Sequence, residues 1–292
     1  MPLQPPVDEI LIRQARPEDA AVCGQICFDA FQTINQAHGF PCDFPNSEVT
    51  TRKLAMIFSH PGYYAAVAEV NGRIVGSNCL DERSSIAGAG PLSIDPHLQN
   101  RGVGRMLMHA VMTRASERGA AGVRLVQAVF HSRSLGLHIS LGFETREPIS
   151  CVQGRTLQRN VPGCTVRPAR AADLRACNAL AQQVHGFHRG RELVENIAGG
   201  SALVVEREQR ITGYASSLGF FGHATAETNL DMQALIASAE SFAGPGILLP
   251  ARNTALIHWC LANGLRIVQP MTLMSLGMYN EPAGAWLPSV QF

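Results

Sequence analysis

The sequence lacks several features that define other classes of protein. None of its eight cysteines forms a C-x-x-C pair, and no Cys/His cluster has zinc spacing, so we expect no resident metal. No apolar run reaches the roughly 20 residues of a membrane span. The formal net charge is only +1 and no basic stripe is visible, which argues against nucleic-acid binding. These absences leave a globular protein without membrane or nucleic-acid partners.

A targeting segment is also absent from the sequence. Residues 1–6 show no basic stretch followed by an apolar core, so we expect no secretory signal. The cysteines are scattered, which suits a reducing compartment. We therefore expect a cytoplasmic protein, and the sequence contains no indication of its oligomeric state.

An internal repeat divides the chain. Three segments of the first half recur in the same order in the second half: 12–20 resembles 166–174, 65–76 resembles 202–213, and 141–143 resembles 263–265. The segments indicate, in turn, a strand leading into a helix, a hairpin, and a glycine between a helix and a strand. We predict two α/β domains of one fold, 1–155 and 164–292, joined by a polar linker.

Segment 99–105 carries the clearest chemical signal. It reads Q-N-R-G-V-G-R, follows a strand-like segment and runs into a helix whose apolar residues recur at helical spacing. Gly102 and Gly104 let a pyrophosphate approach bare backbone N–H groups at the helix start, where the helix dipole also attracts anions. Arg101 and Arg105 add positive charge. Neither a G-x-x-x-x-G-K-S/T loop nor a G-x-G-x-x-G loop is present; the alternative is an ordinary glycine-rich turn.

Residues 92–108 resemble the signature of the GNAT superfamily of acyl-CoA N-acyltransferases. The pattern Q/R-x-x-G-x-G/A is matched by Gln99, Gly102 and Gly104. The resemblance covers the first domain and, more weakly, the second. It implies that each domain is a mixed, mostly antiparallel sheet flanked by helices, and that an amine attacks the thioester of acetyl-CoA directly. The acetyl-CoA-binding residues expected from the loop and the resemblance are Leu92, Ser93, Ile94, Gln99, Asn100, Arg101, Gly102, Val103, Gly104, Arg105 and His131.

The residues that would move protons depart from the family pattern. Counting back from 142–143, His138 stands where the family often has a tyrosine acid, and His131 stands where it has an asparagine. An imidazolium can protonate a thiolate, so His138 is the candidate general acid; the alternative is a packed or surface histidine. His131 either hydrogen-bonds CoA or caps a helix. Asp81 and Glu82 are the candidate bases, with a solvated turn and a water chain as alternatives.

The second domain lacks a G-x-G loop between residues 213 and 253, so we expect no second CoA site there. The tail, 286–292, is expected either to add a strand to the first domain or to complete the second. In the first case the terminal carboxylate would approach the reaction centre.

Three functions are compatible with these patterns. The leading hypothesis is an N-acetyltransferase that acetylates a primary amine of a small molecule or peptide. The alternative is a catalytically inactive acyl-CoA-binding sensor, and the third is a structural tandem domain that binds nothing. The sequence names neither the amine nor the acyl length.

Overall fold

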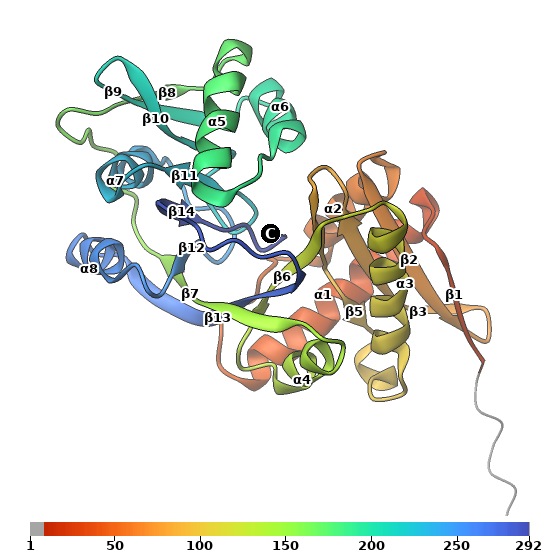
Figure 1. The fold of residues 1–292 in the computed structure, drawn as a ribbon. Helices are drawn as coiled ribbons and strands as arrows, with labels where there is room; N and C mark the ends of the chain where they lie inside the picture. Colours follow the sequence, from red (N-terminus) through yellow and green to blue (C-terminus); the bar gives the residue numbers. More distant parts are fainter. Residues whose placement is uncertain (1–8, 292) are drawn as a thin grey trace, which may run out of the picture.

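The chain folds around two β-sheets, each covered by helices (Figure 1). The computed structural model describes residues 9–291. The first half contains β1 (Ile10–Gln14), α1 (Ala20–Ala37), α2 (Ser47–Ser59), β2 (Tyr63–Val70), β3 (Arg73–Asp81), β4 (Ile86–Ala89), β5 (Ser93–Ile94), α3 (Val103–Glu117), β6 (Gly122–Ala128), α4 (Ser132–Ser140) and β7 (Glu144–Gln153). The second half contains β8 (Thr165–Pro168), α5 (Leu174–His185), α6 (Gly190–Ala198), β9 (Leu203–Arg207), β10 (Arg210–Ala215), β11 (Ala224–Ala226), α7 (Asn229–Ser238), β12 (Ile247–Pro250), α8 (Thr254–Ala262), β13 (Arg266–Gly277) and β14 (Ala285–Leu287).

The repeat predicted from the sequence has a counterpart in ion pairs. In the first half Arg13 bonds Asp19 at 2.7 Å and also Glu69. In the second half Arg167 bonds Asp173 at 2.7 Å and also Glu206. Each arginine thereby ties its first strand to the start of the following helix and to the hairpin. The two halves begin with the same local structure.

The first sheet has nine strands in the order β1-β2-β3-β4-β6-β13-β7-β12, with β5 on β3. Only β4 and β6 pair in parallel; the other pairings are antiparallel. The second sheet has the order β14-β11-β10-β9-β8, and all its pairings are antiparallel. The predicted fold class, α/β with mostly antiparallel sheets flanked by helices, is confirmed; of the two described sheets, the first is mixed and the second is purely antiparallel.

The two halves exchange strands. β13, from the second half, lies between β6 and β7, and β7 lies between β13 and β12. In Figure 1 the blue β13 runs beside the lime β7 beneath the C-terminus. The second-half strands that join the first sheet are thus β13 and β12, whereas the tail strand β14 pairs with β11 in the second sheet. The first of the two places predicted for the tail is therefore wrong and the second is right; Phe292 lies outside the described residues.

Within residues 9–291 no helix combines the length and hydrophobicity needed to cross a bilayer.

The shared strand predicts that the two halves unfold together. Leu273 of β13 is fully buried, whereas Ile267 on the same strand is 49% exposed. Leu273→Ala is expected to lower the free energy of unfolding by about 2–5 kcal/mol, because it removes packing from a closed core. Ile267→Ala, the control, should cost less than about 1 kcal/mol. Urea denaturation should show one transition in both variants; two separate transitions would contradict the coupling.

Candidate active site

A cavity of about 360 Å³ opens where two strands of the first sheet part. β4 and β6 pair from Ile86 with Gly122 to Gly88 with Arg124 and no further. On its other side β6 pairs with β13 along its whole length, while beyond Gly88 the neighbouring strand passes through Gly90 and continues as β5 on β3. The parted strands leave backbone and side chains of both facing the cavity.

The glycine-rich loop forms one end of this cavity. Gly102 is the N-cap of α3 and has φ +87°, a backbone conformation that favours glycine. Because glycine has no side chain, no side-chain oxygen of the N-cap accepts from the first N–H groups of α3. Gln99 donates to the carbonyl of Ile94 at 3.3 Å and so ties the loop to β5. Gly104 lies so close to Ile94 that an added Cβ would be 3.2 Å from its side chain. The loop therefore presents a helix start with unused donors, a suitable cradle for a phosphate.

Most of the residues predicted to bind the cofactor line the cavity. They are Leu92, Ser93, Ile94, Gln99, Asn100, Gly102, Val103, Gly104, Arg105 and His131. Arg101 is not among the lining residues. Arg133, which the sequence analysis did not single out, also lines the cavity and reaches Asn100 at 3.5 Å.

The two predicted histidines take different places. His131 is the N-cap of α4: its Nδ1 accepts from the backbone N–H of Ser134 at 3.0 Å, which is the capping alternative. His138 is buried, and its Nδ1 donates to Oε1 of Gln127 at 2.8 Å. Burial lowers the pKa of His138 to about 4, so the ring is neutral near pH 7. The structure places His138 at the cavity but does not favour the imidazolium that an acid role requires.

The two carboxylates predicted as bases lie elsewhere. Asp81 pairs with Arg83 at 2.5 Å, and Glu82 pairs with Arg114 at 2.6 Å. Neither lines the cavity. Their charges are already balanced by arginines, so the geometry offers no path from either carboxylate to a bound amine.

A different carboxylate lines the cavity. Asp43, in the connection between α1 and α2, is only 8% exposed and accepts from Nδ2 of Asn35 at 3.4 Å. Burial raises the pKa of Asp43 to about 6, while the amides of Gln269 and Asn35 act in the opposite direction. Sequence reasoning missed Asp43 because it lies in no motif; its only local signal is an acid within an otherwise apolar stretch.

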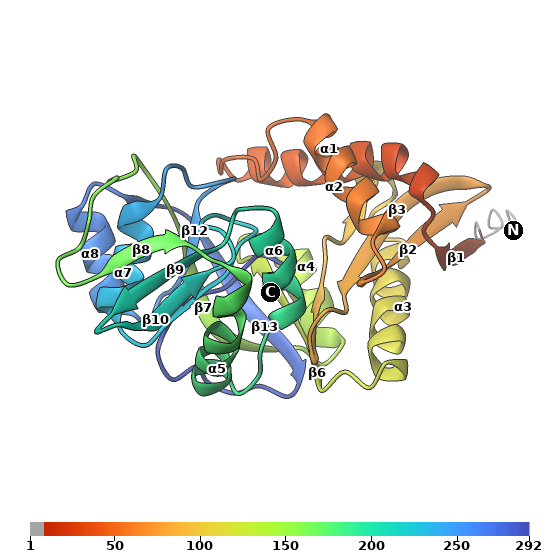
Figure 2. The ribbon, with the colours of Figure 1, turned by 90° about the horizontal axis from the view of Figure 1, so that it is seen from above.

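The second half completes the cavity. Phe220, Phe221, Met271, Val290 and Gln291 line it together with the first half. The tail is anchored there because the N–H of Val290 donates to the carbonyl of Phe220 and the hydroxyl of Ser289 donates to that of Phe221. In Figures 1 and 2 the chain end marked C lies between the two lobes. The site is therefore composite, with the loop from one half and part of the opposite wall from the other.

Comparison with known proteins agrees with this geometry. Residues 29–143 match the model of the acetyltransferase (GNAT) family. The first half of the chain thus contains a GNAT-type acetyltransferase domain, as the sequence predicted. None of the curated proteins compared with it matches.

Several solved structures share the fold over nearly the whole chain. A putative acetyltransferase from Pyrococcus horikoshii is 17% identical with a TM-score of 0.73, over 97% of this chain and 95% of that one. A GCN5-related N-acetyltransferase from Sphaerobacter thermophilus is 14% identical with a TM-score of 0.61, over 96% and 98%. A tandem GNAT protein from the clavulanic acid biosynthesis pathway is 15% identical with a TM-score of 0.57, over 96% and 100%. At these identities the likeness is one of fold, and it includes the tandem arrangement.

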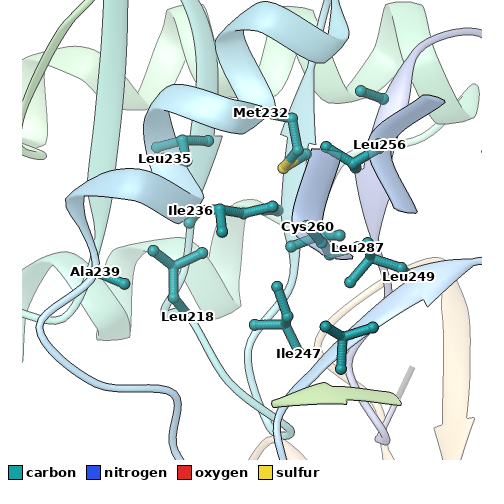
Figure 3. Close-up of a cluster of buried hydrophobic side chains, with 14 of the residues drawn as sticks. Leu218, Met232, Leu235, Ile236, Ala239, Ile247, Leu249, Leu256, Cys260 and Leu287 are labelled. Atoms are coloured by element: carbon teal, nitrogen blue, oxygen red, sulfur yellow. The ribbon is translucent and has the colours of Figure 1, made fainter. Parts of the chain in front are cut away.

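The second GNAT-like unit has its equivalent cleft filled. Where β4 and β6 part in the first unit, β14 occupies the second unit, paired with β11 and in contact with β12. Leu287 of β14 belongs to a closed apolar cluster with Ile247, Leu249 and Leu256 (Figure 3). The start of α7 is capped by Thr228, and Asp231 in its first turn adds a negative charge. A phosphate would find neither space nor free donors there.

Within residues 9–291 no group of three or more His, Cys, Asp or Glu side chains is arranged to hold a metal ion. The match of residues 29–143 to the GNAT model supports an acetyltransferase in general, and the shared fold agrees with it.

Proposed function

We propose that the protein transfers the acetyl group of acetyl-CoA directly to a primary amine. The observation that carries the proposal is the single cavity that connects the start of α3 with the buried carboxylate of Asp43. One end suits a pyrophosphate, and the other offers a base for an ammonium group. The proposal assigns CoA binding to residues 1–155 and a supporting role to residues 164–292.

The proposed reaction needs a free amine and a polarised thioester. The Asp43 carboxylate takes the proton that the bound ammonium must lose. The nitrogen then attacks the acetyl carbonyl, the C–S bond breaks, and the second nitrogen proton passes to the leaving sulfur to give the CoA thiol. Nε2 of Gln127 is buried, lines the cavity and has no hydrogen-bond partner within residues 9–291, so it is our candidate donor to the carbonyl oxygen.

His138 has a positioning role in this proposal. Its neutral ring and Ser134 both donate to Oε1 of Gln127, at 2.8 and 2.9 Å. Because these two bonds hold Oε1, the Nε2 of the same amide remains available to a bound ligand. Asp81 and Glu82 have no part in the proposed chemistry.

A cytoplasmic location is proposed on chemical grounds. All eight cysteines are free thiols, and six of them are buried. Free thiols persist in a reducing compartment.

The proposal predicts one acetyl-CoA per chain. Calorimetric titration should give a stoichiometry near one, since the second unit has its cleft filled by β14. Release of free CoA thiol should then depend on added amine, measured with a thiol reagent over a panel of amines. Binding without release in any amine would favour the inactive sensor, which the neutral state of His138 supports. A stoichiometry of two, or no binding, would refute the assignment of the site.

A further inference from the structure

Two groups of opposite charge face the amine end of the cavity. Asp43 lies before α2 and Lys53 lies on α2, and both line the cavity. Asp43 precedes Phe44, whose ring stacks on Phe221 with the centroids 5.8 Å apart, and Lys53 lies over the same Phe221 ring, so both charges belong to one end of the cavity. No ion pair joins Asp43 to Lys53, or Lys53 to any other carboxylate, in the part of the chain that the structure describes. The cavity therefore offers an anionic and a cationic position that do not neutralise each other by contact.

Lys53 is set in an apolar environment. Its Nζ lies 3.5 Å from the centroid of the Phe221 ring, which comes from the second half. Burial lowers the pKa of Lys53 to about 8, and the ammonium form still predominates at pH 7. A cation with little water and no carboxylate partner gains much from binding an anion.

A neutral donor from the tail lines the same cavity, and the residue before it, Val290, bonds the carbonyl of Phe220. Nε2 of Gln291 is inaccessible and has no hydrogen-bond partner among residues 9–291, and its side chain lines the same cavity. A buried N–H group without an acceptor is costly, and an oxygen of a bound ligand would satisfy it. Both Lys53 and Gln291 therefore favour a ligand with acceptor oxygens.

The rest of this end of the cavity is apolar. Phe31, Phe44, Phe220 and Met271 line it. Such walls suit a hydrocarbon body rather than a second polar chain.

We propose that the acceptor is a small amphoteric amine, an amino acid with an apolar side chain, whose ammonium group faces Asp43 and whose carboxylate faces Lys53 and Gln291. This inference rests on the N-acetyltransferase function proposed above. It names the class of amine that the function leaves open.

The test uses matched pairs of ligands. Leucine is compared with 3-methylbutylamine, and phenylalanine with 2-phenylethylamine, since each amine lacks only the carboxylate. Binding of each to the full chain saturated with CoA is measured by calorimetry, so that no turnover is needed. Release of CoA thiol from acetyl-CoA is measured separately with the same four compounds.

Three variants separate charge from structure. Lys53→Met keeps an apolar stem against Phe221 but removes the charge, and Lys53→Arg keeps the charge. Arg52→Met, at the exposed neighbouring position on α2 outside the cavity lining, is the control.

We expect at least one amino acid to bind tenfold or more tightly than its carboxylate-free partner. Lys53→Met should abolish this preference, whereas Lys53→Arg and Arg52→Met should keep it. Equal binding within both pairs, binding of none of the four compounds, or a preference that survives Lys53→Met would overturn the inference. Amino-acid binding without CoA release would leave the inference standing and refute the proposed catalysis. Release of CoA thiol with the two simple amines, but with neither amino acid, would support the proposed catalysis and refute the inference that the acceptor is an amino acid.

Discussion

Gly102→Asp is expected to raise the dissociation constant for acetyl-CoA about a hundredfold, equivalent to about 2.7 kcal/mol. The substitution places a carboxylate at the N-cap of α3, where we propose that the pyrophosphate lies. Two like charges about 4 Å apart repel by several kcal/mol at an effective dielectric constant of roughly 20. Aspartate is among the residues that tolerate the left-handed conformation, and an added Cβ at Gly102 meets nothing within 4 Å. The fold should therefore survive while binding, measured by calorimetry, is lost.

Gly119→Asp is the matched control. Gly119 follows the other end of α3, has φ +67°, and likewise has open space around an added Cβ. Both variants place the same charge at a glycine of positive φ, on either side of one helix. Affinity for acetyl-CoA should change less than twofold in Gly119→Asp. Equal losses in the two variants would mean that the loop acts through stability alone.

The loop was readable from the sequence because its geometry is local. Gly102 has a left-handed backbone and α3 begins at the next residue, so a short stretch of sequence contains the complete glycine-rich loop and helix start. The same holds for the repeated pairs Arg13–Asp19 and Arg167–Asp173, each of which joins residues only six apart. Local patterns specify local structure.

The amine end of the cavity was not readable. Asp43 and Lys53 come from the segment around α2, Phe221 from a loop after β10, and Gln291 from the tail, and no motif links these segments. Only the tertiary fold brings them to one wall. The choice of strand partner is similarly non-local: β13 has an ordinary strand pattern, and nothing in it states that its neighbours are β6 and β7.

The predicted base shows how a local pattern can mislead. Asp81 ends β3 and Glu82 follows it, and Asn78 of the same strand does line the cavity. Arg83, the next residue, and Arg114, on α3, bind these carboxylates instead. A carboxylate in a sequence indicates a charge, whereas its partner is decided by the packing of distant elements.

Asp43→Asn is expected to lower kcat/KM by about 10²–10⁴, the range typical of losing a general base. Asparagine keeps the size and can still bond Asn35 but cannot accept the proton of an ammonium. In the unmodified protein the carboxylate must be ionised to act, and its pKa is raised to about 6. The rate should therefore fall about tenfold per pH unit below pH 6 and level off above it. Asp43→Asn should lack this limb, as measured by CoA release between pH 5 and 8.

Stability provides the control for Asp43→Asn. Because the pKa of Asp43 is raised on folding, the folded state favours the protonated form, and the ionised form costs stability above pH 6. Asp43→Asn should thus unfold at a urea concentration no lower than the unmodified protein at pH 7.5, so that lost activity reflects lost chemistry. Glu48→Gln removes an exposed carboxylate five residues away, outside the cavity lining, and should leave both rate and pH limb unchanged. If Asp43→Asn kept the acid limb, the titrating group would be another one, and Asp43 would have only a binding role.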